Sequence, residues 1–340
     1  MEYREFLDKV KQDLEAMMPG NEVSVRNVQK LQGKSYYGIS VKPEDGIMAV
    51  SLNLEVFHHR FEEGQDYRQI LTGIIETVRE AQAREMQIPL NSIKDYDQVK
   101  ERLTVQLVGR EENEDRLLTI PHHDMEDMCL VYYIDMGQVD GSAASILITN
   151  ETLHGYGISV EQLHQDALKS AQERQPFVIL GMNEVIAELM GMEPEEVGGA
   201  PDLFVATNPE KMNGAGVIAY PGFMDTAEEK MNGNFFILPS SIHEVIMVPD
   251  NGLMTYQEME AMVGEINETQ VPPEERLTNR VYHYDCQEKV FELAEKFDVR
   301  MRGKEEERPS VLKSLEEYKA NVVPRKSGAV VSRNEPALSM

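Results

Sequence analysis

The chain has 340 residues, of which 41% are apolar, so it is long enough to bury a sizeable core in about two domains. Its formal net charge of −27 disfavours binding of nucleic acid or of an anionic membrane by the body of the protein, because phosphates would be repelled. The charged start of the chain and the absence of a run of about 18 apolar residues predict neither a signal peptide nor a membrane span.

Charge and cysteine content differ along the chain in an informative way. Residues 300–340 contain nine of the 33 basic and six of the 60 acidic residues, so this tail carries +3 and residues 1–299 carry −30. The two cysteines, Cys129 and Cys286, lie in apolar or aromatic surroundings without Cys-x-x-Cys spacing. Two such thiols predict buried packing in a reducing compartment, the cytoplasm.

The first third of the sequence alternates between helical and extended patterns. Apolar residues recur at helical spacing until Pro19-Gly20, and turn residues then separate three strand-like runs that predict an antiparallel meander. The expected elements are a helix at 2–18, strands at 22–31, 35–42 and 46–54, a helix at 67–86, and a short helix in 95–110 that leads into the strand "LTVQLVG".

The rest of the chain predicts a second module of strands and helices. Ser159 is expected to cap the helix that follows it, with Gln162 in the reciprocal position of a capping box. "FFILP" and "HEVIMVP", separated by "SSI", predict a tight hairpin, and 280–293 predicts a strand and a short helix. The other expected strands are 117–121, 128–136, 142–149, 177–182, 203–207 and 216–220, and the other helices are 159–172, 183–191, 221–231 and 255–267.

Together these elements predict an α+β fold with mixed, largely antiparallel sheets and packed helices. The acidic segment "REENED" at 110–115 is expected to be a loop and the boundary between the modules 1–110 and 116–300. The charged, mildly basic tail 303–340 is expected to be partly disordered, because its last part has no periodicity.

Two stretches carry a family resemblance. "TNETLHGYGISVEQLHQDALKSA" (149–171), followed by "GAGVIAYPGFMDTAEEKMNGNFFILPSSIHEVIMVPD" (214–250), resembles the bacterial family known as domain of unknown function 5688 over most of residues 1–300. More distantly, over about 120–265, it resembles the domain of unknown function 1444 family. The resemblance implies a fold and a bacterial cytoplasmic setting, and it implies no activity, cofactor or catalytic residue.

The pairs Glu55/His58 and His59/Glu62 each show the spacing Glu-x-x-His or its reverse, which is half of a carboxylate-bridged di-iron site. No second Glu-x-x-His lies on a long apolar helix, so a solvated helix is the favoured interpretation.

The segment 121–128 gathers imidazole and carboxylate groups, which are suitable ligands for zinc or manganese. The residues are His122, His123, Asp124, Glu126 and Asp127. Adjacent residues converge on one ion only if a loop wraps around it, so the favoured interpretation is an acidic connector that enters a strand.

His154 and His164 flank the phrase "GYGIS", and a structural role is favoured over a general-base role for both. The glycines of "GAG" at 214–216 precede an apolar run, whereas a dinucleotide fingerprint follows a strand and opens a helix. Phosphate binding there is not expected.

The stretch 240–250 contains the residue types of a hydrolase triad, namely Ser240, Ser241, His243, Glu244 and Asp250. Known triads are assembled from distant parts of the chain, so polar residues at a hairpin turn are the favoured interpretation, with a local bond from a serine to the backbone.

We therefore assign no catalytic, cofactor-binding or metal-binding residue from sequence. The acidic body, the 20 methionines and the basic tail favour a non-enzymatic protein-binding or accessory factor with a protein partner. The alternatives are a hydrolase or metal-dependent enzyme that uses His122/His123 or Ser241/His243, and a protein that binds a small ligand.

Overall fold

In a computed structural model, the fold is described for residues 1–307 except 29–30, 34–35, 45–48, 86–92, 140–141, 199–201 and 240. The chain divides into two units, Met1–Ala294 and Glu295–Met340. Residues 308–340, most of the predicted tail, lie outside the described part. No helix among the described residues is both long and apolar enough to cross a membrane.

The N-terminal part is the predicted helix, meander and helix. One face of its first helix carries the buried side chains of Phe6, Leu7, Val10 and Leu14, which pack against one face of the meander and against the last helix. All strand pairs are antiparallel, in the order β1-β2-β3. The elements are α1 (Tyr3–Met17), β1 (Asn21–Val28), β2 (Tyr36–Pro43), β3 (Val50–Leu52), α2 (Glu55–Glu62) and α3 (Tyr67–Glu85).

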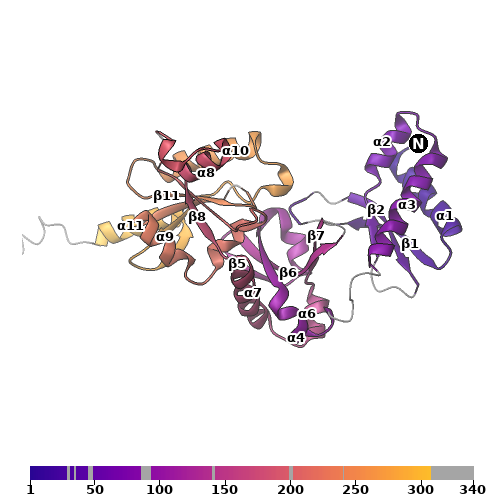
Figure 1. The fold of residues 1–340 in the computed structure, drawn as a ribbon, viewed down its shortest axis with the longest axis horizontal. Coiled ribbons are helices and arrows are strands. Elements are labelled where there is room, and N and C mark those ends of the chain that lie inside the picture. Colours follow the sequence, from indigo (N-terminus) through magenta and orange to yellow (C-terminus); the bar gives the residue numbers. More distant parts are fainter. Residues whose placement is uncertain are drawn as a thin grey trace, which may run out of the picture. The chain divides into compact units, whose positions relative to one another are not determined.

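A four-stranded antiparallel sheet follows, with the longest strand at its centre. Even-numbered residues of β6, such as Leu130 and Tyr132, point into the main core, and Cys129 and Val131 pack on the opposite face. The main core also receives the apolar stripe of α7, which lies along this sheet (Figure 1). The elements are α4 (Tyr96–Val99), β4 (Leu103–Gly109), α5 (Glu114–Leu117), β5 (His122–Met125), β6 (Met128–Val139), β7 (Ser142–Leu147), α6 (Asn150–Tyr156) and α7 (Val160–Arg174).

The third sheet has six antiparallel strands in the order β13-β12-β10-β11-β9-β8. Phe235 and Ile237 of β10 face the main core, whereas Phe236 and Leu238 face the apolar side of α10. Its elements are β8 (Val178–Gly181), α8 (Met182–Met190), β9 (Phe204–Thr207), α9 (Phe223–Met231), β10 (Phe235–Leu238), β11 (Val245–Pro249), α10 (Tyr256–Thr269), β12 (Tyr282–Asp285) and β13 (Val290–Leu293), followed by α11 (Ala294–Glu307).

The α+β class is confirmed, and several local predictions are wrong. Residues 117–121 are not a strand, and "REENED" is not a loop, because helical turns run from Glu111 to Leu117. Residues 216–220 are not a strand either. Residues 216–219 belong to a 3₁₀ helix, Gly214–Ala219, which ends at Tyr220. Gly214 lies in a narrow space at the start of this helix, and the amide of Ala215 donates to the carbonyl of Ile242. Short apolar runs do not by themselves distinguish these states.

Two predictions about the third sheet also need correction. The connection between β10 and β11 has six residues, 239–244, so the pair is a hairpin with a longer loop than predicted. The short helix expected within 280–293 is instead the second strand of the hairpin β12–β13.

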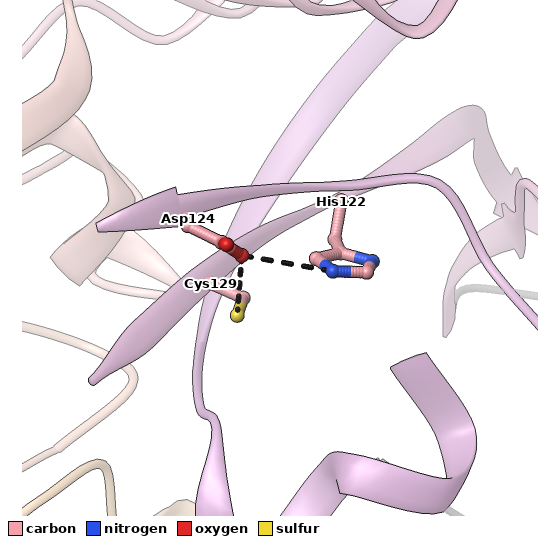
Figure 2. A group of neighbouring side chains, drawn as sticks. All are labelled: His122, Asp124 and Cys129. Carbon is pink, nitrogen blue, oxygen red and sulfur yellow. Dashed lines mark hydrogen bonds and ion pairs between the residues drawn. The ribbon is translucent and has the colours of Figure 1, made fainter. Parts of the chain in front are cut away.

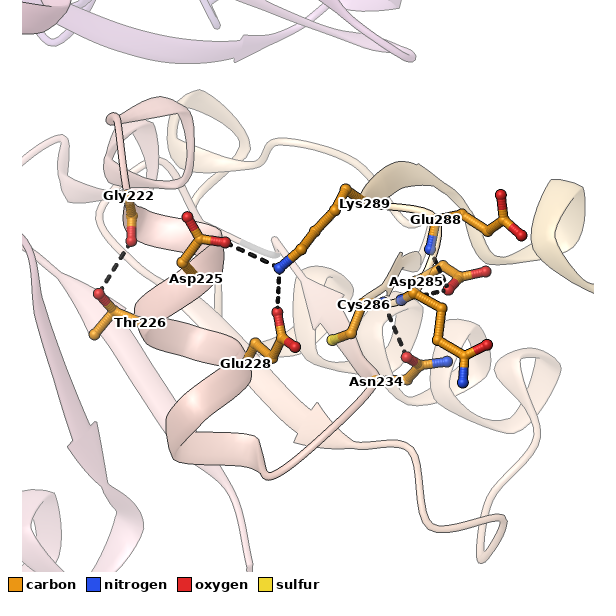
Figure 3. A network of polar contacts seen from close by, with 10 residues as sticks. Gly222, Asp225, Thr226, Glu228, Asn234, Asp285, Cys286, Glu288 and Lys289 are labelled. Atoms are coloured by element: carbon orange, nitrogen blue, oxygen red, sulfur yellow. Dashed lines mark hydrogen bonds and ion pairs between the residues drawn. The ribbon is translucent and has the colours of Figure 1, made fainter.

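The turn of the hairpin β12–β13 is fastened to α9 (Figure 3). Lys289, whose φ is +54°, places its ammonium group 3.0 Å from Asp225 Oδ1 and 2.5 Å from Glu228 Oε2. The carboxylate of Asp285 accepts hydrogen bonds from two amides of the turn, and the amide of Cys286 donates to the Asn234 side chain at 2.9 Å. Side chains of the turn and of α9 thus set the position of this sheet edge.

A buried amide network joins the β1–β2 connection to distant parts of the chain. Gln32 is 5% exposed, and its side-chain oxygen accepts a hydrogen bond from the backbone amide of Gly109 at 3.2 Å. The backbone amide of Gln32 donates to Asn113 Oδ1 at 2.8 Å. Its side chain also bonds to the Asn113 side chain and donates to the carbonyl of Arg276. The network satisfies polar groups that would otherwise be buried without partners.

The modules 1–110 and 116–300 remain a prediction. A boundary at 110–115 would cut β4 away from its neighbours, because β4 pairs with β6 over its whole length. A boundary between α3 and α4 would leave that sheet whole.

Candidate functional site

The hairpin of β5 and β6 brings together three potential metal ligands. In its register, Asp124 lies opposite Cys129, and His122 is two residues before Asp124 on the same strand. Side chains two apart on a strand, and side chains directly opposite across a pair, share one face. His122, Asp124 and Cys129 therefore converge, although nothing in the sequence indicated the pairing of 124 with 129.

Figure 2 shows how the three side chains meet around one carboxylate oxygen. Asp124 Oδ1 lies 3.6 Å from His122 Nε2 and accepts a hydrogen bond from the Cys129 thiol at 3.5 Å. The three potential ligand atoms all lie within 4.8 Å of one another. The Arg110 guanidinium also pairs with Asp124 Oδ1.

The surroundings of Cys129 hold its sulfur in the thiol form. Burial is the main reason that the pKa of Cys129 is raised to about 12, and Asp124 acts in the same direction while Arg110 opposes it. The side chain is fully buried against an apolar cluster that includes Val131 and Ile120. At neutral pH the group is therefore a hydrogen-bond donor and not a free nucleophile.

The neighbouring His123 belongs to the other face of the hairpin. Its ring stacks on that of His164 with centroids 4.1 Å apart, and the Tyr132 hydroxyl lies 3.0 Å from His164 Nδ1. Burial and, second, the nearby His123 lower the pKa of His164, whereas Glu161 opposes the shift. The adjacent residues His122 and His123 thus lie on opposite faces of the hairpin. His164, which belongs to the stretch 149–171 that carries the family resemblance, stacks on His123.

His164 is expected to weaken the protein in mild acid. Because its folded-state pKa is lowered, the unfolded chain binds the proton more readily, and stability is lost as the pH falls from the ordinary value of 6.5 through the folded pKa. Urea unfolding of the wild type and of His164→Gln at about pH 7.5 and about pH 5 measures this effect. The variant should lose less stability between the two pH values, and an equal or larger loss would contradict the prediction.

A cavity with a volume of about 800 Å³ lies beside the β5–β6 turn. Charged side chains of both signs line it, among them Arg110, Arg276 and Asp127. Asp127 is held by two hydroxyl donors, Thr278 at 3.0 Å and Tyr282. Burial, and then the carboxylate of Asp127, raise the pKa of Tyr282 far above its usual range, so this hydroxyl stays a donor.

Asn267 at the end of α10 presents an unsatisfied acceptor at this cavity. Its side chain is 2% exposed, and its amide nitrogen donates to the Thr278 carbonyl at 3.1 Å and to Asn279 Oδ1 at 2.6 Å. Its Oδ1 has no hydrogen-bond partner in the described structure. Buried polar atoms are nearly always paired, so this acceptor is an exception among the described residues.

The triad candidates are distributed among separate partners. Ser241 Oγ accepts a bond from the backbone amide of His243 at 3.0 Å, which is the local serine-to-backbone bond that the sequence suggested. The His243 ring accepts from the Asn213 amide at 3.2 Å and lies 3.6 Å from Glu275. Asp250 instead contacts His283 at 3.1 Å.

The remaining candidates near the β10–β11 connection add no catalytic arrangement. Burial raises the pKa of Glu244. Ser240 lies outside the described residues.

The histidines of α2 do not converge with one another. His58 lies against Tyr3 and Phe6 and contacts the Met1 carbonyl at 2.9 Å, whereas His59 is exposed and pairs with Glu63 at 3.4 Å. Each imidazole thus has its own local partners.

Sequence reasoning did not identify the cavity residues Asn267, Arg276 and Thr278. Asn267 lies at the end of α10, and Thr278 and Arg276 lie between α10 and β12, in a stretch without a motif. This stretch meets the β5–β6 turn through the hydrogen bond from Thr278 to Asp127, a contact between distant parts of the chain. Among the residues that line the cavity, sequence reasoning had named Asp127 as a potential metal ligand.

The fold and this region define an acidic α+β protein with a polar cavity beside a His/Asp/Cys cluster. Comparison with family models matches residues 3–286 to the "Family of unknown function (DUF5688)". The match covers most of the chain, so the protein belongs to this family, as its resemblance implied. It lends no support to the more distant resemblance to the 1444 family. No curated protein and no solved structure was found to match the chain.

Proposed function

We propose that this protein is a non-enzymatic binding or accessory factor of the bacterial cytoplasm, and that it holds a polar segment of a partner protein in the cavity beside the β5–β6 turn. The observation that carries the proposal is at Asn267, a residue that lines the cavity: its buried Oδ1 atom has no hydrogen-bond partner in the described structure.

The chemistry of the cavity suits a peptide segment. A backbone amide of the partner can donate to Asn267 Oδ1, and an acidic side chain can approach the guanidinium of Arg276. Glu268 and Asp127 on the same walls favour a neighbouring cationic or amide group. The volume lies within the range of sites that enclose small molecules or a few side chains.

Charge and cysteine state support the same setting. The net charge of −27 makes nucleic acid an unfavourable partner. Both cysteines are free, which is the usual state in a reducing compartment.

Site-specific photocrosslinking tests the proposal. A photoreactive amino acid at position 268 places the probe on the cavity wall, and the same substitution at position 265 is the matched control, because Glu265 is also an exposed residue of α10 but does not line the cavity. In lysate of the source organism, we expect a discrete protein adduct from position 268 and not from position 265.

A competing variant sharpens the test. With the probe at position 268, the substitution Asn267→Asp alters the acceptor at the cavity with little change in size, and it should reduce the adduct severalfold. Adducts of equal yield from 265 and 268, or no adduct from 268, would contradict the proposal.

A further inference from the structure

The His122, Asp124 and Cys129 cluster has the composition of a transition-metal site. Imidazole nitrogen, thiolate sulfur and carboxylate oxygen together are ligands that zinc accepts, whereas magnesium and calcium prefer oxygen alone. The three groups come from two paired strands and not from one loop, so the rigid hairpin itself sets their spacing.

The orientation of His122 supports this reading of the cluster. Its Nδ1 atom lies 3.1 Å from the Ile120 carbonyl, so Nδ1 carries the proton and donates to that oxygen. The lone pair of Nε2 then points towards Asp124 Oδ1, 3.6 Å away. The Nε2 lone pair and the carboxylate oxygen are both acceptors and repel each other, and a proton or a metal ion between them removes this repulsion. Metal-binding histidines are usually held in this way by a backbone carbonyl.

The distances agree with a tetrahedral site. Bond lengths of about 2.0 to 2.3 Å place neighbouring ligand atoms of tetrahedral zinc about 3.3 to 3.6 Å apart. The separations from Asp124 Oδ1 are 3.6 Å to His122 Nε2 and 3.5 Å to Cys129 Sγ. The separation of Nε2 from Sγ is at most 4.8 Å, so a closing movement of the imidazole of about 1 Å completes the third edge.

The environment around these ligands fits a bound cation. Arg110 pairs with Asp124 Oδ1, the same oxygen that is offered to the metal, and so holds this carboxylate at the cluster, as neighbours of metal-binding carboxylates commonly do. The Asp124 side chain is 62% exposed, which leaves the fourth position open to water, whereas the buried Cys129 closes the opposite side.

We propose that His122, Asp124 and Cys129 bind one zinc ion, with water as the fourth ligand. Binding forms one bond from each side chain to the metal and transfers the proton of the Cys129 thiol to the solvent. None of the three ligands lines the proposed partner cavity, although Arg110 lines it and pairs with Asp124, and the proposal does not require that a partner binds there.

Cobalt(II), which replaces zinc and absorbs light, provides the test with the full-length protein. After removal of metal with a chelator, we expect one equivalent of Co²⁺ to produce a thiolate-to-cobalt charge-transfer band, and Zn²⁺ to abolish it. Cys129→Ser should remove the band. His122→Ala and Asp124→Asn should weaken binding at least about 100-fold, because even the loss of an outer partner costs 10- to 100-fold.

The chain offers a matched control for each ligand type. Cys286→Ser removes the only other cysteine, and His123→Ala removes a histidine one residue away on the opposite face of the hairpin. Both should bind cobalt as the wild type does. Asp124 is exposed, so Asp124→Asn remains informative if Cys129→Ser fails to fold.

Three outcomes would overturn the proposal. The first is a wild type without the charge-transfer band. The second is a band that persists in Cys129→Ser or disappears in Cys286→Ser. The third is unchanged affinity in both His122→Ala and Asp124→Asn.

Discussion

Gly214→Ala is expected to lower the free energy of unfolding by about 3 kcal/mol, because an added methyl group has no room there. A Cβ at this position would lie 2.5 Å from the carbonyl oxygen of His243 and 2.8 Å from the amide nitrogen of Asn208, and it would also collide with the Thr207 hydroxyl. Two of these obstacles are backbone atoms, so a side-chain rotation does not relieve them. Urea unfolding monitored by circular dichroism measures the change.

Gly216→Ala is the matched control, two residues away in the same 3₁₀ helix. A Cβ there would have its nearest contact at 3.4 Å, with a methyl group of Val105, so the expected loss is about 1 kcal/mol or less. Equal losses in the two variants would show that close packing at Gly214 is not the reason for this glycine.

Gln32→Ala is expected to destabilise the protein by about 2 to 4 kcal/mol, since each buried polar group left without a partner costs about 1 to 3 kcal/mol. The change removes the acceptor of the Gly109 amide, the donor to the Arg276 carbonyl and a partner of the Asn113 side chain. Thermal and urea unfolding measure the loss.

Gln98→Ala provides the comparison for Gln32. The Gln98 side chain is exposed and donates to the Asp95 carboxylate at 3.0 Å, so its removal should change the free energy of unfolding by less than about 0.5 kcal/mol. The double variant of Gln32 and Asn113 should lose less than the sum of the single variants, because the two share hydrogen bonds. Additive losses would contradict the network.

Elements with strong local signals were predicted from sequence. The stripe from Phe6 to Leu14 marked α1, and Ser159 caps α7 by accepting from the Gln162 amide at 3.1 Å. Gln162 itself does not complete a capping box, because its side chain donates to Asp166. Thus the start of α7 was predictable from Ser159, whereas the hydrogen-bond partner of the Gln162 side chain was not, because a long side chain can reach several neighbours on the helix surface.

Apolar runs without a clear period were interpreted less well. Val217, Ile218 and Tyr220 belong to the main core, and a short apolar run of this kind resembles a strand although residues 214–219 form a 3₁₀ helix. The turn at Asp285 could not be foreseen as a hairpin either, since it depends on Lys289 reaching the carboxylates of α9.

The candidate site shows the same division between local and distant information. Sequence identified His122 and Asp124 as suitable ligands and rejected them because adjacent residues seldom surround an ion. The register of β5 with β6 supplied Cys129, which stood in the sequence only as a packing residue. Strand register is a long-range property, and one sequence without its structure does not determine which residue faces which.

The buried contact between Gln32 and Arg276 has a consequence for the order in which the chain folds. These residues are 244 positions apart, so a growing polypeptide completes the hairpin of β1 and β2 long before the carbonyl that Gln32 requires has been synthesised. Until then, a polar side chain destined for burial remains in water, and the early hairpin has only part of its final stability. A nascent chain that stops before residue 276 therefore exposes the polar groups around Gln32, close to its N-terminus. Chaperones and proteases would encounter this N-terminal region first.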